Sequence, residues 1–205
     1  KELFLNVPAR RKFLKTPQTE FRKIVETFIP VALIHPDIHF VFESEGKIKY
    51  NLPANENATS NSLHPNRTSE LLKAIEWVEV FYDGEGTTIG GSVAHPSHHS
   101  KRTSHRYVFI NGRPIWDAGV AKSVEVGANR FIPDGHRLPF LLSLTLPYDQ
   151  VDVNVHPRKL EVRLANPYRV YSAVERAVKR AFEDSLGKDG MDRAVNRLRS
   201  HTANR

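Results

Sequence analysis

The stretch VDVNVHPRKLEV, residues 151–162, joins a strand pattern to a stiff basic turn. Its first five residues alternate valine with Asp152 and Asn154, which is the period-two pattern of a half-buried β-strand. The alternation stops at His156, and apolar residues resume only after two adjacent cations. The pattern therefore predicts a strand over residues 151–155 that ends in a turn.

The turn itself has a defined backbone. Pro157 fixes its own backbone dihedral and drives His156 toward an extended conformation. The cations that follow, Arg158 and Lys159, are therefore displayed at a defined place. A lysine on a rigid tip is a point charge suited to a terminal phosphate, whereas a solvated surface turn is the simpler interpretation. The residues alone leave both interpretations open.

The composition is that of a soluble globular protein. With 205 residues, of which 40% are hydrophobic and 26% charged, the chain can form one substantial domain with its own core. No apolar run is long enough to span a bilayer, so we expect no membrane partner. Cysteine is absent, which excludes disulfides and thiolate metal sites and fits a reducing compartment. Residues 1–15 lack the apolar core of a signal peptide, and we expect a cytoplasmic protein.

The charge is basic and unevenly distributed. Thirty Lys and Arg against 23 Asp and Glu give a net charge of +7, which favours polyanionic partners such as nucleic acid. Residues 1–23 hold seven Lys or Arg against two Glu. Residues 95–106 hold three Lys or Arg and four His without any acid. A soluble basic protein without a nucleic-acid partner is the simpler alternative.

The hydrophobic periodicity predicts a series of helices and strands. Thr16 and Pro17 start a helix that Pro30 kinks or splits and that His35-Pro36 ends. Strands are expected at 38–43, 47–52, 77–82, 87–94, 107–110 and 138–146, and helices at 69–75, 118–131 and 167–186.

Polar segments separate these elements. Residues 53–68 and 95–106 are predicted to be mobile loops, and residues 188–205 a linker or tail. Because strands are interleaved with helices and several strands are joined as hairpins, we expect an α+β domain with a mixed β-sheet.

No motif amounts to a self-sufficient catalytic centre, so no catalytic residue is predicted. The acidic and glycine-rich residues 83–86 resemble a nucleotide loop, but their place between alternating strands is typical of a hairpin turn. Three histidines within residues 95–99 have zinc-like spacing, yet they lie in a predicted exposed loop and no metal is expected. Glu125 and Asn129 fit an E-x-x-x-N magnesium pattern whose spacing is too common to count alone.

Three motifs carry a resemblance to a known family. LFLNVPARRKFLK (3–15), YVFINGRPI (107–115) and VDVNVHPRKLEVR (151–163) closely resemble the bacterial MutL family of DNA mismatch repair proteins. The resemblance implies that residues 1–15 are the last strand and junction of an ATPase domain and that residues 16–187 are its transducer domain. It also implies the ribosomal-protein-like transducer fold of GHKL ATPases, with helices mainly on one face of a mixed sheet and a left-handed βαβ crossover.

For function, the resemblance implies an ATP-dependent clamp that dimerises around DNA. ATP and Mg would bind in the ATPase domain that is missing here, so this fragment is expected to hold no cofactor and not to be an enzyme alone. Lys159 occupies the position of the family's lysine that senses the ATP γ-phosphate, and Asp152 and Asn154 would orient its loop. The expected partners are DNA, the missing ATPase domain, a second N-terminal region and a MutS-type mismatch sensor.

The family lines its DNA groove with basic residues of the transducer. The matching or neighbouring residues are Arg113, Lys101, Arg102 and Arg106, with Arg10, Arg11 and Lys12 at the domain junction serving either packing or DNA. Where relatives have further arginines after Asn-Gly-Arg, residues 114–118 here contain no cation. We therefore expect DNA binding that is weaker or that has moved onto the His-rich loop 95–106. Trp116 is expected in the core instead of stacking on a base.

Two other functions stay open at this point. One is the transducer of a topoisomerase-type GHKL ATPase, in which a comparable lysine loop contacts ATP. The other is a basic ribosome-associated domain of the same fold, which needs no role for Lys159. The sequence NVHPRK, residues 154–159, favours mismatch repair.

Overall fold

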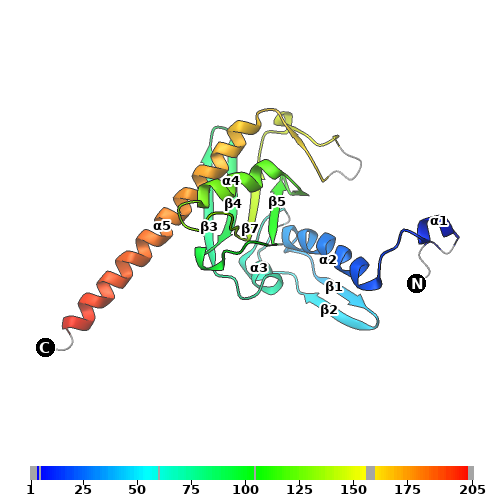
Figure 1. Ribbon diagram of the computed structural model, residues 1–205, viewed down its shortest axis with the longest axis horizontal. Helices are drawn as coiled ribbons and strands as arrows, with labels where there is room; N and C mark the ends of the chain where they lie inside the picture. The colour runs from blue at the N-terminus through cyan, green and yellow to red at the C-terminus, as the bar shows by residue number, and fades with distance from the viewer. Residues whose placement is uncertain (1–3, 5, 60, 104, 156–159, 203–205) are drawn as a thin grey trace.

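The computed structural model describes residues 4, 6–59, 61–103, 105–155 and 160–202. A five-stranded sheet forms its centre, in the order β3-β4-β7-β5-β6 (Figure 1). Its strands are β3 (Trp77–Gly84), β4 (Thr87–Ala94), β5 (Arg106–Ile110), β6 (Arg113–Ile115) and β7 (Phe140–Thr145). The strand predictions for this part of the chain are confirmed to within two residues.

The sheet is mixed, as predicted. Strand β5 runs parallel to β7, with Arg106 opposite Phe140 and Ile110 opposite Leu144, while the other neighbouring strands are antiparallel. Parallel neighbours need a crossover connection, and here it contains β6 and helix α4 (Ala118–Ala128). The handedness of this crossover stays a prediction.

One face of the sheet carries a layer of two helices, α4 and α5 (Pro167–Thr202). The helix predicted at 167–186 is confirmed, and it buries one apolar stripe in which Val174, Val178 and Phe182 are fully buried. Each such side chain stabilises the fold by about 1.5–3 kcal/mol. Gly127 lets the two helices approach closely, since a Cβ atom there would meet the carbonyl oxygen of Glu175 at 2.7 Å.

The opposite face is covered only in part. Helix α2 (Pro17–Ile34) and the short helix α3 (Pro65–Leu71) pack there against Phe109 and Leu141 of the sheet. Pro30 lies inside α2, which continues without a break. Of the two predicted effects of Pro30, the split is wrong and the kink stays a prediction; proline removes one backbone hydrogen bond, and the last turn of the helix is buried.

A hairpin stands beside the sheet, formed by β1 (Phe40–Ser44) and β2 (Lys47–Leu52) (Figure 1). Its aromatic side chains pack on α2, and the rings of Phe28 and Phe42 lie 5.0 Å apart. Glu45 and Gly46 both have positive φ angles, at 53° and 70°, as a tight two-residue hairpin turn requires. The predicted hairpin is confirmed.

A buried arginine joins α2, α3 and the hairpin. The side chain of Arg67 is completely buried and donates hydrogen bonds to the carbonyl oxygens of Ala32 (2.8 Å), Ile38 (2.9 Å) and Pro53 (2.8 Å). Helix α3 begins at Pro65, so the prediction that residues 65–68 belong to a loop is wrong. That prediction counted the polarity of the segment and missed that its arginine points inward.

Both ends of the chain differ from their predicted structure. Residues Pro8–Arg11 form a short helix, α1, instead of a basic turn, and most of the strand expected at 3–5 lies outside the described residues. Helix α5 continues to Thr202 and so runs through most of the predicted tail, 188–205. In the described part of the chain, no helix combines the length and apolar character needed to cross a membrane.

Candidate nucleotide-sensing loop and basic surfaces

The loop that the opening motif predicts leaves the domain between two very short strands. Strand β8 (Val151–Asp152) pairs antiparallel with β9 (Arg163–Leu164), and the described residues next to these strands, 153–155 and 160–162, lead away from the central sheet (Figure 1). The predicted five-residue strand is wrong beyond Asp152, because β9 offers only two residues to pair with. The valines at 153 and 155 are accordingly 37% and 42% exposed.

A side chain turns the chain out of β8. The Asp152 carboxylate Oδ1 accepts a hydrogen bond from the backbone N–H of Asn154 at 2.9 Å. This contact is an Asx-turn, which sets the direction of the departing loop. Residues 156–159 lie outside the described residues, so the position of Lys159 stays a prediction.

The returning arm of the loop is tethered to the start of α4. The backbone N–H of Trp116 donates to the Leu160 carbonyl at 2.7 Å. Next to it, Asp117 caps α4 by accepting from the N–H of Val120 at 2.8 Å. The other Asp117 oxygen receives the Tyr171 hydroxyl of α5 at 3.5 Å, and burial together with this carboxylate raises the pKa of Tyr171. The returning arm of the loop and α5 therefore both contact the junction between β6 and α4.

The ring of Trp116 lies on the surface of the junction between β6 and α4. It is 58% exposed, beside a Leu160 side chain that is 47% exposed. The expectation that Trp116 belongs to the core is wrong, because its backbone ends β6 and turns into α4 with the ring directed outward. Trp116 and Leu160 therefore present exposed apolar side chains where the returning arm of the loop meets the start of α4.

A basic loop lies at the start of β5. Lys101 and Arg102 are both exposed. Their loop is fixed to the segment before β7 by a backbone pair, in which Ser100 N–H donates to Arg137 O at 3.0 Å and Arg137 N–H donates to Ser100 O at 2.8 Å. The pairing places Arg137, whose side chain is 49% exposed, next to the predicted cations.

Arg106 is held inside this cluster. Its side chain is only 12% exposed, pairs with Glu125 at 3.2 Å and stacks 5.6 Å from the ring of Phe140. Burial lowers the pKa of Arg106, the charge of Glu125 opposes that shift, and Arg137 adds to it. The guanidinium is therefore a packed structural group, and the prediction that it is available to DNA lacks support from its geometry.

Glu125 lies at the centre of this cluster of charged side chains. The sequence did not predict that it would pair with several cations. It also pairs with Arg137 at 3.2 Å and with Lys122 at 3.6 Å. Only the Lys122 pair, three residues away on α4, has a local signal in the sequence. The magnesium interpretation of Glu125 is not needed, because its carboxylate serves three cations.

The Asn-Gly-Arg turn is at the other end of β5. Asn111 and Gly112 have φ angles of 49° and 75° and form a tight turn, after which exposed Arg113 pairs with Ile110. The Asn111 side chain donates to the Leu146 carbonyl at 3.0 Å and accepts from the Leu146 N–H at 2.9 Å. Four strand steps of about 3.4 Å separate Arg106 from this end, so the predicted cations form separate patches.

A third basic position is α1, where Arg10, Arg11 and Lys12 are all exposed. Figure 1 shows α1 away from the central sheet, near the start of the chain. The structure thus distributes the predicted DNA-binding residues over the basic loop, the Asn-Gly-Arg turn and α1.

The histidines of the basic loop make local contacts. His98 Nε2 accepts the backbone N–H of Glu76 at 3.1 Å, and the rings of His99 and His136 meet edge to face at 4.8 Å. Burial lowers the pKa of His105. Within the described ranges, no three His, Asp or Glu side chains are grouped as metal ligands.

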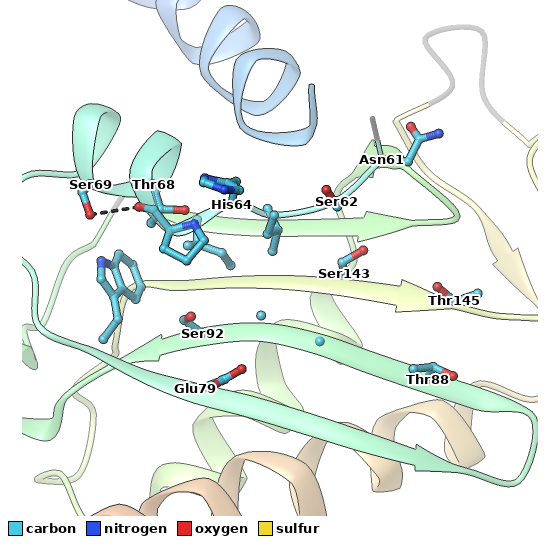
Figure 2. Close-up of a pocket in the computed structure, with 16 residues that line it drawn as sticks. Asn61, Ser62, His64, Thr68, Ser69, Glu79, Thr88, Ser92, Ser143 and Thr145 are labelled. Atoms are coloured by element: carbon cyan, nitrogen blue, oxygen red, sulfur yellow. Dashed lines mark hydrogen bonds between the residues drawn. The ribbon is translucent and has the colours of Figure 1, made fainter. Parts of the chain in front are cut away.

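A polar groove lies on the open part of the sheet (Figure 2). It has a volume of about 480 Å³ between the segment Asn61–Ser69 and the faces of β3, β4 and β7. Hydroxyl groups of Ser92 and Ser143 line its floor, and His64 lies across from them. None of the predicted site residues lines this groove.

The comparisons with known proteins agree with this fold. The crystal structure of the N-terminal domain of a DNA repair protein superposes with a TM-score of 0.67 at 22% identity, over 90% of this chain and 60% of that one. The Aquifex aeolicus MutL ATPase domain complexed with ADP gives a TM-score of 0.54 at 25% identity, over 85% of this chain and 55% of that one. The fold is therefore that of an α+β domain of DNA repair proteins, and the predicted transducer fold is confirmed.

The sequence comparisons are more specific. The family described as DNA mismatch repair protein, C-terminal domain, matches residues 69–183, which is more than half of the chain. The DNA mismatch repair protein MutL of Flavobacterium johnsoniae is 33% identical over 183 residues, covering 89% of this chain. The chain belongs to this DNA mismatch repair family, as the motifs predict. It spans 28% of the length of that relative.

Proposed function

We propose that this chain is the transducer module of a MutL-type mismatch repair ATPase. It contacts DNA and supplies a lysine that senses the ATP γ-phosphate, which couples the nucleotide state to dimerisation of the N-terminal regions. The observation that carries the proposal is the pair of anchors on either side of the predicted lysine, the Asx-turn at Asp152 and the backbone hydrogen bond between Trp116 and Leu160.

The anchors at Asp152 and Leu160 are suited to a loop that senses the γ-phosphate. A charge stabilises one nucleotide state over another only if its loop reaches the γ-phosphate in that state and not in the other. The Asx-turn at Asp152 and the Trp116–Leu160 hydrogen bond fix the two described arms from which the predicted sensor residues are reached. The exposed apolar side chains of Trp116 and Leu160 would pack on the ATPase domain.

The partners follow from the same proposal. ATP and Mg bind in the ATPase domain, for which a relative complexed with ADP gives support. The module alone is not an enzyme; its partners are DNA, the ATPase domain of its own protein, a second N-terminal region and a MutS-type mismatch sensor. The proposed location is the cytoplasm.

The lysine is tested by joining the chain to its ATPase domain and measuring ATP turnover of Lys159→Ala. Loss of a γ-phosphate contact is expected to lower turnover by one order of magnitude or more. Lys47→Ala, at the exposed tip of the β1–β2 hairpin, is the matched control and keeps full turnover. Equal turnover of the two variants would refute the sensing role.

For DNA, we propose that the basic loop is the main contact and Arg113 a second one. The loop presents Lys101, Arg102 and Arg137 together, whereas the Asn-Gly-Arg turn presents one exposed cation. This arrangement supports the expectation that DNA binding has moved toward the His-rich loop. Arg106 contributes by packing, through Glu125.

The two contacts are separable by salt dependence. Each phosphate contact contributes about 0.9 to the slope of log affinity against log salt, so Lys101→Glu with Arg102→Glu should lower the slope by about 2 and Arg113→Glu by about 1. Lys47→Glu with Lys49→Glu makes the same charge change on the exposed hairpin and serves as control. An unchanged slope in the loop double variant would count against this surface.

A further inference from the structure

Strand β3 is an open edge of the sheet. It is the first strand in the sheet order and, among the described residues, pairs with β4 alone over eight uninterrupted residue pairs from Trp77 to Gly84. In an antiparallel pair, half of the backbone N–H and C=O groups of an edge strand point away from its neighbour. An edge of this length without proline or bulge is a template for a further strand.

One face of β3, which carries Val78, Val80 and Tyr82, is covered by α5; we call it the lower face. Val78 and Val80 are buried in the core beneath α5. Arg176 of α5 lies 5.4 Å from the centre of the Tyr82 ring, on the same side. If a strand were added to β3, helix α5 would cover the face that continues Val78, Val80 and Tyr82. The sequence specificity of binding would then come from the opposite, upper face.

The upper face presents an alternating series of acid, aromatic and acid. Glu79, Phe81 and Asp83 are all exposed, with Phe81 67% exposed. In the described part of the chain, neither acid has an ion pair with a cation. The Thr88 hydroxyl donates to Asp83 Oδ1 at 3.0 Å and so orients that carboxylate.

Space beside Phe81 is open as well. Its partner on β4 is Gly90, and a Cβ atom built on that glycine would meet nothing within 4 Å. Glu79 is at the border of the groove, and Figure 2 shows it on β3 next to Ser92. The Phe81 ring is 67% exposed, so an apolar side chain from an added strand can pack on it.

The charges on the exposed face of β3 indicate which kind of molecule could bind there. The chain carries a net charge of +7, yet the exposed face of β3 holds two acids and no cation. The acids repel nucleic acid. They also oppose pairing with a second copy in the register that stacks Phe81 on Phe81, because Glu79 would then face the Asp83 of that copy.

We propose that the edge of β3 binds an extended basic segment of a partner polypeptide by strand addition. The backbone of β3 supplies hydrogen bonds, and Glu79, Phe81 and Asp83 select a cation, an apolar residue and a cation at alternating positions. This interaction is independent of nucleotide sensing and of the DNA surfaces.

The probe is a fluorescein-labelled peptide, acetyl-Thr-Lys-Thr-Val-Thr-Lys-Thr-amide, titrated with the whole chain by anisotropy. The control peptide Lys-Thr-Thr-Val-Thr-Thr-Lys has the same charge but places both lysines on the other face of a strand. The first peptide should bind at least about tenfold more tightly than the second. Equal affinities would overturn the proposal.

Variants locate the site. Glu79→Lys with Asp83→Lys should weaken binding by at least about tenfold, whereas Glu43→Lys with Asp149→Lys, the same charge change at other exposed acids, should not. Unchanged binding in the first double variant would refute this edge. Circular dichroism of both variants verifies that they fold.

Backbone methylation tests strand addition itself. Methylating one alternate set of peptide nitrogens should abolish binding, while methylating the other set should preserve it, because only one set faces β3. Binding that survives both modifications would overturn the proposal. So would a dimer of the chain in sedimentation that Phe81→Lys dissociates, since the edge would then be occupied by a second copy.

Discussion

Two segments of this chain show how order depends on the partners of the backbone. Residues 53–68 are polar and rich in turn formers, yet Arg67 and backbone hydrogen bonds from Asn55 to Pro36 (2.9 Å) and from Asn61 to Ile34 (2.8 Å) attach them to α2. Residues 151–155 have the regular alternation of a strand, yet of these five only Val151 and Asp152 pair, in β8.

The difference teaches that local pattern and local order are separate properties. The polar segment is fixed because a buried guanidinium satisfies carbonyls of three neighbouring elements at once. In the alternating segment, pairing ends after Asp152 because the partner strand β9 has only two residues, and Val153 and Val155 are exposed. The first arrangement stabilises the fold, and the second leaves a loop available for a ligand.

The strongest test of this comparison is Arg67→Met. It removes a fully buried cation and leaves several carbonyl oxygens of α2 and the hairpin without donors. We expect the free energy of unfolding to fall by about 3–5 kcal/mol, measured by urea denaturation. Arg22→Met, at an exposed site on α2, is the control and should change it by less than about 0.5 kcal/mol. A small effect at Arg67 would mean that the hairpin and α2 pack well without it.

Glu125→Gln gives a smaller effect. It leaves the largely buried Arg106 without its carboxylate, and Arg137 and Lys122 lose the same partner. Because these groups are partly exposed, we expect a loss of about 1–2 kcal/mol together with tighter DNA binding, since one negative charge leaves the basic loop. Unchanged stability with weaker DNA binding would contradict the role of Glu125 as the organiser of this cluster.

The dependence of stability on pH is a weaker effect. Burial lowers the pKa of His105 in the folded state below its ordinary value of 6.5, so the unfolded chain binds more protons in the window just below pH 6.5. Stability is therefore lost as pH falls through that window. His105→Gln should flatten the unfolding free energy between pH 7 and pH 5 relative to the wild type, while an unchanged slope would assign the effect to another group.

The smallest change in stability is expected at the loop. Asp152→Ala removes the Asx-turn at an exposed site, and the free energy of unfolding should change by less than about 0.5 kcal/mol. The same variant, joined to the ATPase domain, should lower ATP turnover because the loop loses its direction, and Asp152→Asn should retain part of it by keeping a side-chain acceptor. A large loss of stability would show that this loop is part of the folding core.

Much of the fold can be predicted from local pattern. The strands of β3 and β4, the hairpin β1–β2 and the apolar stripe of α5 follow from periodicity and turn residues, since their partners are adjacent in sequence or their burial is regular. The family motifs likewise predict a loop after β8, whereas its lysine lies outside the described residues and stays a prediction. These features depend on neighbours within a few residues.

The rest depends on contacts distant in sequence. Nothing local distinguishes buried Arg67 from exposed Arg113, because the carbonyls that Arg67 serves come from α2, the hairpin and the segment between them. Similarly, the pairing of Arg106 with Glu125 exists only once α4 has folded over the start of β5. The length of β8 was unpredictable for the same reason, since it is set by β9.

The most direct test of the central claim is hydrogen exchange of residues 153–162 in the protein joined to its ATPase domain. If the loop senses the γ-phosphate, its amides should exchange rapidly without nucleotide and with ADP, and should become protected only with a non-hydrolysable ATP analogue. Equal exchange in the ADP and ATP-analogue complexes would contradict the account.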